Sequence, residues 1–400
     1  MKLKLLKTTI KGLKLYKDNC LEFDWIATKK VSQDEVEERI VDHLFGSIYK
    51  QNLIAIAGIN ASGKTSTLKL LTMMLELFIE NKTLSDLSNK EILEQLDDKC
   101  TFINVFFSEN TLFELTSNVI RTEEGLLEFE SEFIKEKKTR NNIGRDSLLD
   151  FSEINPQLIR KDLDEMSMGF LRSDSSIFML VLKNLGLLNH GNYIHDLTQY
   201  TNMNIMGSLS EISSGYIQYL DPDIESIEFL RPSDQKTINS KSLAKILVRI
   251  KFSDQEPKEI SYMDLTKYLS SGTIKGINIL LRIERALKYG GYILIDELEN
   301  HLNKTVAITL INLFKSEINE NNATLIFSTH YSEILDDIER SDSIYFSTKK
   351  NGKINLTNLS AHSARTDKKK SNIYLSGLLG TAPKYDAYVA LKNTIKAKIH

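Results

Sequence analysis

The residues with the clearest chemical potential form a short glycine-containing stretch near position 60. Residues 58–65 read Gly-Ile-Asn-Ala-Ser-Gly-Lys-Thr and fit the pattern G-x-x-x-x-G-K-S/T. Glycines let consecutive backbone N–H groups turn toward phosphate oxygens, and a helix N-terminus adds its positive dipole end. Lys64 can reach the β- and γ-phosphates of a nucleotide, and the Thr65 hydroxyl can ligate Mg²⁺.

The surroundings of this stretch are those that the pattern requires. A short apolar strand is predicted at 53–57 and a helix at 62–80, so the loop connects a strand to a helix. We therefore predict that the loop binds ATP together with Mg²⁺. The expected nucleotide contacts are Gly58, Asn60, Ala61, Ser62, Gly63, Lys64, Thr65 and Ser66.

Two adjacent acids form the second candidate site. Residues 292–297 read Tyr-Ile-Leu-Ile-Asp-Glu, an apolar strand that ends in Asp296 and Glu297. An acid at the carboxyl end of such a strand, beside a phosphate loop, can hold Mg²⁺ directly or through water. The next acid can orient or deprotonate an attacking water. We predict Asp296 and Thr65 as the metal ligands, and Glu297 and Lys64 as catalytic residues.

Two further stretches indicate a family. Residues 269–273, Leu-Ser-Ser-Gly-Thr, precede a predicted helix, and Ser328-Thr329-His330 ends a predicted strand. Together with the loop and the acids, this order resembles the core of ABC-type ATPases, and most closely their SMC/RecF/OLD-like branch. The resemblance implies that 269–273 is the signature loop and that His330 is a catalytic switch histidine at the γ-phosphate. It also implies that 299–302, with His301, is a dimer-contact loop.

The same resemblance implies a site shared between two copies of the chain. In this family the signature loop of one protomer closes on the nucleotide held by another, so Ser270 and the N–H of Gly272 would contact ATP in trans. Two departures from the family pattern stand out. Where the family has two glycines in the signature loop, this chain has Ser271-Gly272. The family also has a glutamine lid loop, which we expect after the predicted strand 101–107, but Ser108 and Glu109 stand there instead.

The chain ends add weaker resemblances. Residues 11–16 resemble the opening strand and turn of the family, and Tyr16 could stack on adenine, although a tyrosine of the core is the reading that we favour. Residues 374–377, followed by Pro383, resemble the tail of bacterial single-chain AAA/ABC-like ATPases that accompany effector partners in anti-phage systems.

Alternating strands and helices must position these groups. Besides the elements above, strands are predicted at 3–10, 20–25, 224–230, 245–252 and 323–328, an antiparallel hairpin at 113–137, and helices at 34–49, 273–288 and 303–319. Helices that alternate with short buried strands imply a mainly parallel sheet. The expected fold class is α/β, a P-loop NTPase of the ABC-ATPase type with an antiparallel β subdomain and an inserted helical lobe.

We divide the chain into four segments. Residues 1–140 and 223–348 would be the two parts of the ATPase domain, 141–222 the helical insertion, and 349–400 a basic C-terminal region. The last segment has 11 basic and two acidic residues, a net charge of +9, so the rest of the chain carries −12. Such a region could contact phosphate or DNA, although a solvated surface is the simpler reading. The basic runs 135–140 and 368–370 could likewise contact DNA, although solvated loops are again the simpler interpretation.

Composition narrows the class of protein. The 400 residues include 51 basic and 54 acidic ones, and this balance excludes a protein that coats nucleic acid by bulk charge. Two cysteines exclude a disulfide framework and fit a reducing compartment. No apolar stretch approaches the roughly 20 residues that span a bilayer. We expect a cytoplasmic protein that does not contact a membrane.

These observations lead to one expected function and two alternatives. We expect an ATPase whose heads dimerise around ATP and that acts as a switch for a partner effector in anti-phage defence. The first alternative is a RecF-like, ATP-dependent clamp on duplex DNA in DNA repair, which would use the basic residues of 349–400. The second is a scaffold that holds its nucleotide with little hydrolysis. The expected partners are a second copy of the chain, a protein effector and, in the first alternative, duplex DNA.

Overall fold

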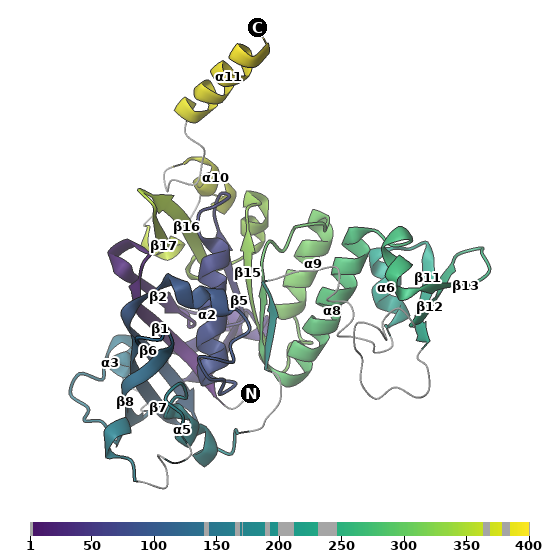
Figure 1. Ribbon diagram of the computed structural model, residues 1–400. Coiled ribbons are helices and arrows are strands. Elements are labelled where there is room, and N and C mark those ends of the chain that lie inside the picture. The colour runs from purple at the N-terminus through teal and green to yellow at the C-terminus, as the bar shows by residue number, and fades with distance from the viewer. Residues whose placement is uncertain are drawn as a thin grey trace.

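Two large sheets with a helix between them form the body of the protein (Figure 1). The computed structural model describes residues 3–139, 144–164, 169, 171–188, 193–198, 212–230, 246–362, 369–377 and 385–399. The main sheet has the strand order β10-β14-β15-β5-β16-β17. These strands are Ile194–Leu197, Tyr292–Ile295, Thr324–Thr329, Leu53–Ala57, Ile344–Lys350 and Lys353–Asn358. All neighbours are parallel except β16 and β17, which confirms the mainly parallel sheet.

Strand β5 illustrates why the strands of this sheet could be predicted from the sequence. Its residues Leu-Ile-Ala-Ile-Ala are all buried. Ile54 and Ile56 belong to the core shared with helix α2 (Lys64–Phe78), whereas the alternate residues belong to the core on the opposite face. Because a parallel strand with both faces covered has no polar side, it reads as a continuous apolar run.

The second large sheet is antiparallel. Its order is β2-β1-β6-β7-β8-β9, formed by Cys20–Asp24, Lys4–Leu13, Leu96–Ser108, Thr111–Arg121, Leu127–Lys138 and Leu158–Ile159. The predicted hairpin is therefore present, and Gly125 at its turn has a φ of +83°. Side chains of this sheet, of α2 and of one face of the main sheet share a single core.

Helices cover the other face of the main sheet. Helices α8 (Ser271–Tyr289) and α9 (Lys304–Phe314) pack there, and α10 (Lys370–Leu375) follows the last strand. A small antiparallel sheet, β11-β12-β13 (Ile224–Leu230, Leu247–Phe252, Lys258–Ser261), packs with α6 (Ser214–Leu220) on the start of α8. Helix α11 (Tyr385–Ile399) extends away from the body (Figure 1). The short 3₁₀ helices are Lys17–Asn19, Lys90–Gln95, Arg160–Asp162, Tyr262–Lys267, Ser332–Asp337, Ser341–Ser343 and Leu359–Ala361.

The helix predicted at 34–49 is wrong. The structure has only the short helix α1 (Gln33–Glu37), followed by the hairpin β3 (Val41–Phe45) and β4 (Ile48–Gln51). Val41 and Phe45, four residues apart as on one face of a helix, are both buried in β3, whose register is irregular between His43 and Phe45, and the chain reverses at Gly46, where φ is +50°. The packing of this segment against the rest of the chain favours strands over a helix.

The segment 141–222 is not helical throughout in its described residues. It contributes α3 (Arg145–Leu149), α5 (Phe178–Asn184) and α6, but also β9 and β10, which belong to the two large sheets. Likewise, the boundary placed at 348/349 falls inside β16, so the start of the basic C-terminal region is part of the main sheet. The division into four segments stays a prediction. None of the helices that the structure describes is long and apolar enough to cross a bilayer.

Candidate functional site

The loop at 58–63 connects the carboxyl end of β5 to α2, and two of its glycines have no room for a side chain. A Cβ on Gly58 would lie 2.4 Å from the backbone oxygen of Ser347. Gly63 has a φ of +103°, and a Cβ there would lie 2.5 Å from the side chain of Ile354. The C-terminal hairpin β16–β17 thus packs directly against the loop, and only glycine fits at these two positions.

The N-terminus of α2 is open. Its N-cap is Gly63, and no side chain among the described residues caps it by a hydrogen bond. Because the first N–H groups of a helix have no partner within the helix, such an end attracts an anion. A cavity of about 320 Å³ lies there. It is lined by Leu15, Asn60, Ala61, Ser62, Gly63, Lys64, Thr65, Ser66, Glu297, Lys349 and Ile354.

Lys64 is buried within the loop. Its Nζ donates hydrogen bonds to the backbone oxygens of Gly58 (2.8 Å) and Ile59 (3.0 Å). Burial lowers the pKa of this ammonium, and the negative charges of Glu297, Asp296 and Glu299 partly oppose that shift. The positive charge is therefore held at the mouth of α2, beside the place where a phosphate would lie.

Asp296 connects the main sheet to α2. The Thr65 hydroxyl donates to Oδ2 of Asp296 at 2.6 Å, and the Ser328 hydroxyl donates to Oδ1. Hydroxyl and carboxylate oxygens are ligands that Mg²⁺ prefers, so this adjacent pair fits the predicted metal ligands, Thr65 and Asp296. Ser328, at the end of β15, is a site residue that the sequence analysis did not single out.

Glu297 also lines the cavity, in an unusual backbone conformation. Its φ is +45°, in the left-handed region. Its N–H donates to Oγ of Ser328 at 2.8 Å, and its backbone oxygen accepts a hydrogen bond from Nζ of Lys275 at 2.9 Å. The structure therefore brings Lys64, Thr65, Asp296 and Glu297 to one place, as the sequence predicted. Their catalytic and metal-binding roles stay predictions.

His330 follows β15 and is held by an acid that the sequence analysis did not assign to the site. Its backbone N–H donates to Oε1 of Glu299 at 2.7 Å, and its Nδ1 lies 2.8 Å from the same oxygen. Because a carboxylate accepts hydrogen bonds, Nδ1 carries a hydrogen in this contact, and only the imidazolium form would also carry one on Nε2 to donate to a phosphate oxygen. Glu299 is only 2% exposed. The sequence could have indicated Glu299 as a site residue, because it lies only three residues after Asp296.

The predicted signature loop lies at the N-terminus of α8. Ser270 is the N-cap, and its Oγ accepts a hydrogen bond from the Thr273 N–H at 3.0 Å. A Cβ on Gly272 would lie 2.4 Å from the backbone oxygen of His301, and Oγ of Ser271 lies 3.2 Å from Nδ1 of the same histidine. Ser270 and Gly272 are not among the described residues that line the cavity at α2, so their contact with nucleotide stays a prediction.

Two other expectations concerned the nucleotide. Tyr16 is a core residue, as favoured: it is 1% exposed and its hydroxyl lies 2.8 Å from Oγ1 of Thr67. The glutamine lid was sought after 101–107, but that segment is part of β6 in the antiparallel sheet. In the main sheet β14 lies between β10 and β15, and the sequence places Gln199 two residues after β10. Gln199 lies outside the described residues.

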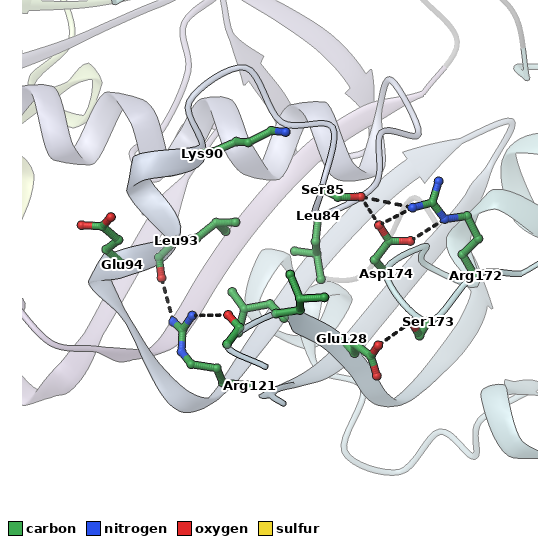
Figure 2. A pocket seen from close by; sticks show the side chains of 13 residues that line it. Leu84, Ser85, Lys90, Leu93, Glu94, Arg121, Glu128, Arg172, Ser173 and Asp174 are labelled. Carbon is green, nitrogen blue, oxygen red and sulfur yellow. Dashed lines mark hydrogen bonds and ion pairs between the residues drawn. The ribbon is translucent and has the colours of Figure 1, made fainter. Parts of the chain in front are cut away.

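A larger cavity, of about 410 Å³, lies elsewhere (Figure 2). The Arg121 guanidinium donates to the backbone oxygen of Leu93 (3.0 Å), and Arg172 pairs with Asp174 (3.0 Å). Its two arginines are thus engaged by the chain itself. The smaller cavity is the candidate nucleotide site, because an open helix N-terminus and the acids meet there.

Some lysines of the basic runs form hydrogen bonds within the protein. Lys135 and Lys137 donate to the backbone oxygens of Phe151 (2.9 Å) and Ser147 (3.2 Å). Arg140, Lys368 and Pro383 lie outside the described residues. On α11, Lys392, Lys396 and Lys398 are exposed.

The fold and the loop define the class: the protein is a P-loop ATPase with an AAA-type domain. Residues 53–336 match the family described as "AAA domain, putative AbiEii toxin, Type IV TA system", and the chain belongs to that family. No curated protein matches the chain. Solved structures similar to it include an SMC head bound to the C-winged helix domain of ScpA (13% identity, TM-score 0.47, 89% of this chain and 99% of that one). The SMC head domain from Thermotoga maritima gives 13% identity, a TM-score of 0.41, and 89% and 98% coverage. At these TM-scores we draw no argument from the likeness.

Proposed function

We propose that the protein hydrolyses ATP to ADP and phosphate and that its heads dimerise around the nucleotide. The observation that carries this proposal is the chain of contacts from the phosphate loop to the acids: Thr65 to Asp296, Asp296 to Ser328, and Ser328 to Glu297. This chain places an acid at the wall of a cavity that begins at an open helix N-terminus. Such a geometry suits hydrolysis of a triphosphate.

In the proposed reaction, backbone N–H groups at the start of α2 and the Lys64 ammonium bind the β- and γ-phosphates. Thr65 and Asp296 would hold Mg²⁺, which when bound would neutralise charge on the phosphate oxygens. The Glu297 carboxylate accepts a proton from water as the water oxygen attacks the γ-phosphorus and the bond to the bridging oxygen breaks. His330, oriented by Glu299, stabilises the charge on the departing phosphate.

The proposed switch involves a second copy of the chain. The α8 N-terminus with Ser270 and Gly272 would close on the γ-phosphate that the other copy holds. Its contacts with His301 support this, since they join the α8 N-terminus to the turn after the acids. Because the family description names a putative toxin of a Type IV TA system, we further propose that the switch controls an effector in anti-phage defence.

A second candidate function is an ATP-dependent clamp on duplex DNA. The observation that favours it is the set of exposed lysines on α11, Lys392, Lys396 and Lys398. Contacts between lysines and phosphates predict DNA affinity that falls steeply with salt. The third candidate, a scaffold with little hydrolysis, predicts bound nucleotide without turnover.

One experiment separates these candidates: steady-state ATP turnover per chain, measured against protein concentration with and without duplex DNA. Head dimerisation predicts that turnover per chain rises with concentration, and constant turnover would contradict it. Stimulation by DNA that disappears at high salt would favour the clamp. Tight ATP binding without turnover at any concentration would favour the scaffold.

A further inference from the structure

Lys275 is a buried lysine of α8 to which no motif assigns a task. Its residue is 3% exposed, and its Nζ donates a hydrogen bond of 2.9 Å to the backbone oxygen of Glu297. It lies five residues after the Ser270 cap, near the start of the helix. A buried ammonium has a high desolvation cost, so a lysine at such a place calls for a physical explanation.

The backbone of Glu297 needs external support. A left-handed conformation at a residue other than glycine is unfavourable and persists only where the surroundings hold it. Here the N–H of Glu297 is bound by Ser328 from β15, and its carbonyl is bound by Lys275 from α8. Two separate elements therefore fix the two sides of the residue, and Lys275 supplies one of them.

The charges around Lys275 explain why an ammonium is used. Asp296, Glu297 and Glu299 crowd one turn, and Oε2 of Glu299 is buried without a hydrogen-bond partner among the residues that the structure describes. Burial lowers the pKa of Lys275 to about 8, and these three acids act against that shift. Lys275 thus places positive charge beside like-charged carboxylates that would otherwise repel one another.

We propose that Lys275 is a positioning residue that keeps the Glu297 carboxylate directed into the nucleotide cavity and ties it to the α8 N-terminus. The inference rests on the proposed function, because it assumes that Glu297 activates water. A second link supports the connection, since Ser271 and Gly272 contact His301 in the turn that begins at Glu297. Movement of the α8 N-terminus against another copy would therefore be transmitted to the acid of its own chain.

The test compares two variants with a control on the same helix. Lys275→Met removes the ammonium and keeps a long apolar stem, Lys275→Arg keeps a charged donor, and Lys288→Met changes a lysine at the far end of α8 that lies 5.5 Å from the Tyr289 ring. Because small misplacement of a reacting group can cost about 100-fold, we expect Lys275→Met to lower kcat by about 10- to 100-fold. Its Kd for ATP should stay near that of the wild type. Lys275→Arg should recover part of kcat, and Lys288→Met should change neither quantity.

Equal kcat in Lys275→Met and the wild type would overturn the proposal. So would parallel losses of kcat and ATP affinity, because they would mean that the site as a whole had collapsed. A wild-type protein that binds ATP but shows no turnover would refute the proposed hydrolysis instead. In that case amide hydrogen exchange decides about Lys275: exchange in 297–302 should rise in Lys275→Met and not in Lys288→Met. Unchanged exchange in that turn would overturn the positioning role without reference to hydrolysis.

Discussion

The two helices that begin near the candidate site differ in how their N-termini are capped. Helix α2 starts at Gly63, in a left-handed conformation, and no described side chain caps it. Helix α8 starts at Ser270, whose hydroxyl accepts from the Thr273 N–H and lies 2.8 Å from the Thr273 hydroxyl. One helix end is left for a ligand, while the other is satisfied by its own chain. A phosphate that docks on α8 must therefore compete with an existing cap, whereas one at α2 meets no such competitor.

The buried lysines near these two ends differ in the same way. Lys64 donates to loop oxygens that a nucleotide phosphate can replace, whereas Lys275 donates to the backbone of Glu297. Burial lowers the pKa of both ammonium groups, and both face the same three acids. The α2 end is thus free of a side-chain cap among the described residues, whereas the α8 end is linked to the backbone of Glu297.

The largest expected effect comes from Glu297→Gln, which sharpens the contrast between the two ends. The variant removes the proton acceptor and keeps the side-chain size, so we expect kcat to fall by about 10²- to 10⁴-fold. ATP binding at the α2 end should persist, and an α8 end that docks in trans should then stay docked. Turnover and size-exclusion chromatography with ATP measure both. Glu320→Gln, at an exposed site, is the control, and wild-type turnover in Glu297→Gln would refute the catalytic assignment.

The next effect tests whether the α2 end binds the nucleotide. Lys64→Ala removes a charged donor, which is worth about 1.5–3 kcal/mol. The Kd for ATP, measured by calorimetry, should therefore rise by about 10- to 100-fold. Lys69→Ala, on the same helix and paired with Glu91 at 2.7 Å, should leave the Kd unchanged. An unaltered Kd in Lys64→Ala would move the nucleotide away from this loop.

A smaller effect tests the cap of α8. Ser270→Ala removes the cap and should lower the free energy of unfolding by about 1 kcal/mol. Ser270→Asp also caps a helix, so it should retain stability, but its negative charge would repel a phosphate brought by a second copy. Denaturant unfolding and ATP turnover measure the two properties. If Ser270→Asp is as stable and as active as the wild type, the cap is structural only and no phosphate docks at α8.

The parts of this site that could be predicted from the sequence are those that depend on local order. Leu53–Ala57 and Tyr292–Ile295 are continuous apolar runs because both faces of a parallel sheet are covered, and the loop and the acids follow them directly. Parallel neighbours end at one edge of the sheet, so the residues after these strands had to lie close together.

The parts that could not be predicted depend on packing between distant segments. Ser328 reaches Asp296 and Glu297 because of the register of β15 beside β14, and Lys275 reaches Glu297 because α8 crosses that edge. The hairpin at 41–51 was mistaken for a helix because its buried residues Val41 and Phe45 lie four apart, as on one face of a helix. Nothing local in the sequence reveals that β10 borders β14.

The smallest effect concerns the stability that is linked to Lys275. Its folded pKa of about 8 lies below the ordinary value of 10.5, so between these pH values the folded chain has released a proton that the unfolded chain keeps. The free energy of unfolding due to this group therefore rises as the pH increases from 8 to 10.5. We expect the wild type to gain about 1 kcal/mol relative to Lys275→Met for each pH unit within this window. Urea unfolding at several pH values measures the difference, with Lys288→Met as the control. Parallel curves for the wild type and Lys275→Met would mean that the ammonium is solvated, and the contrast between the two helix ends would then rest on the caps alone.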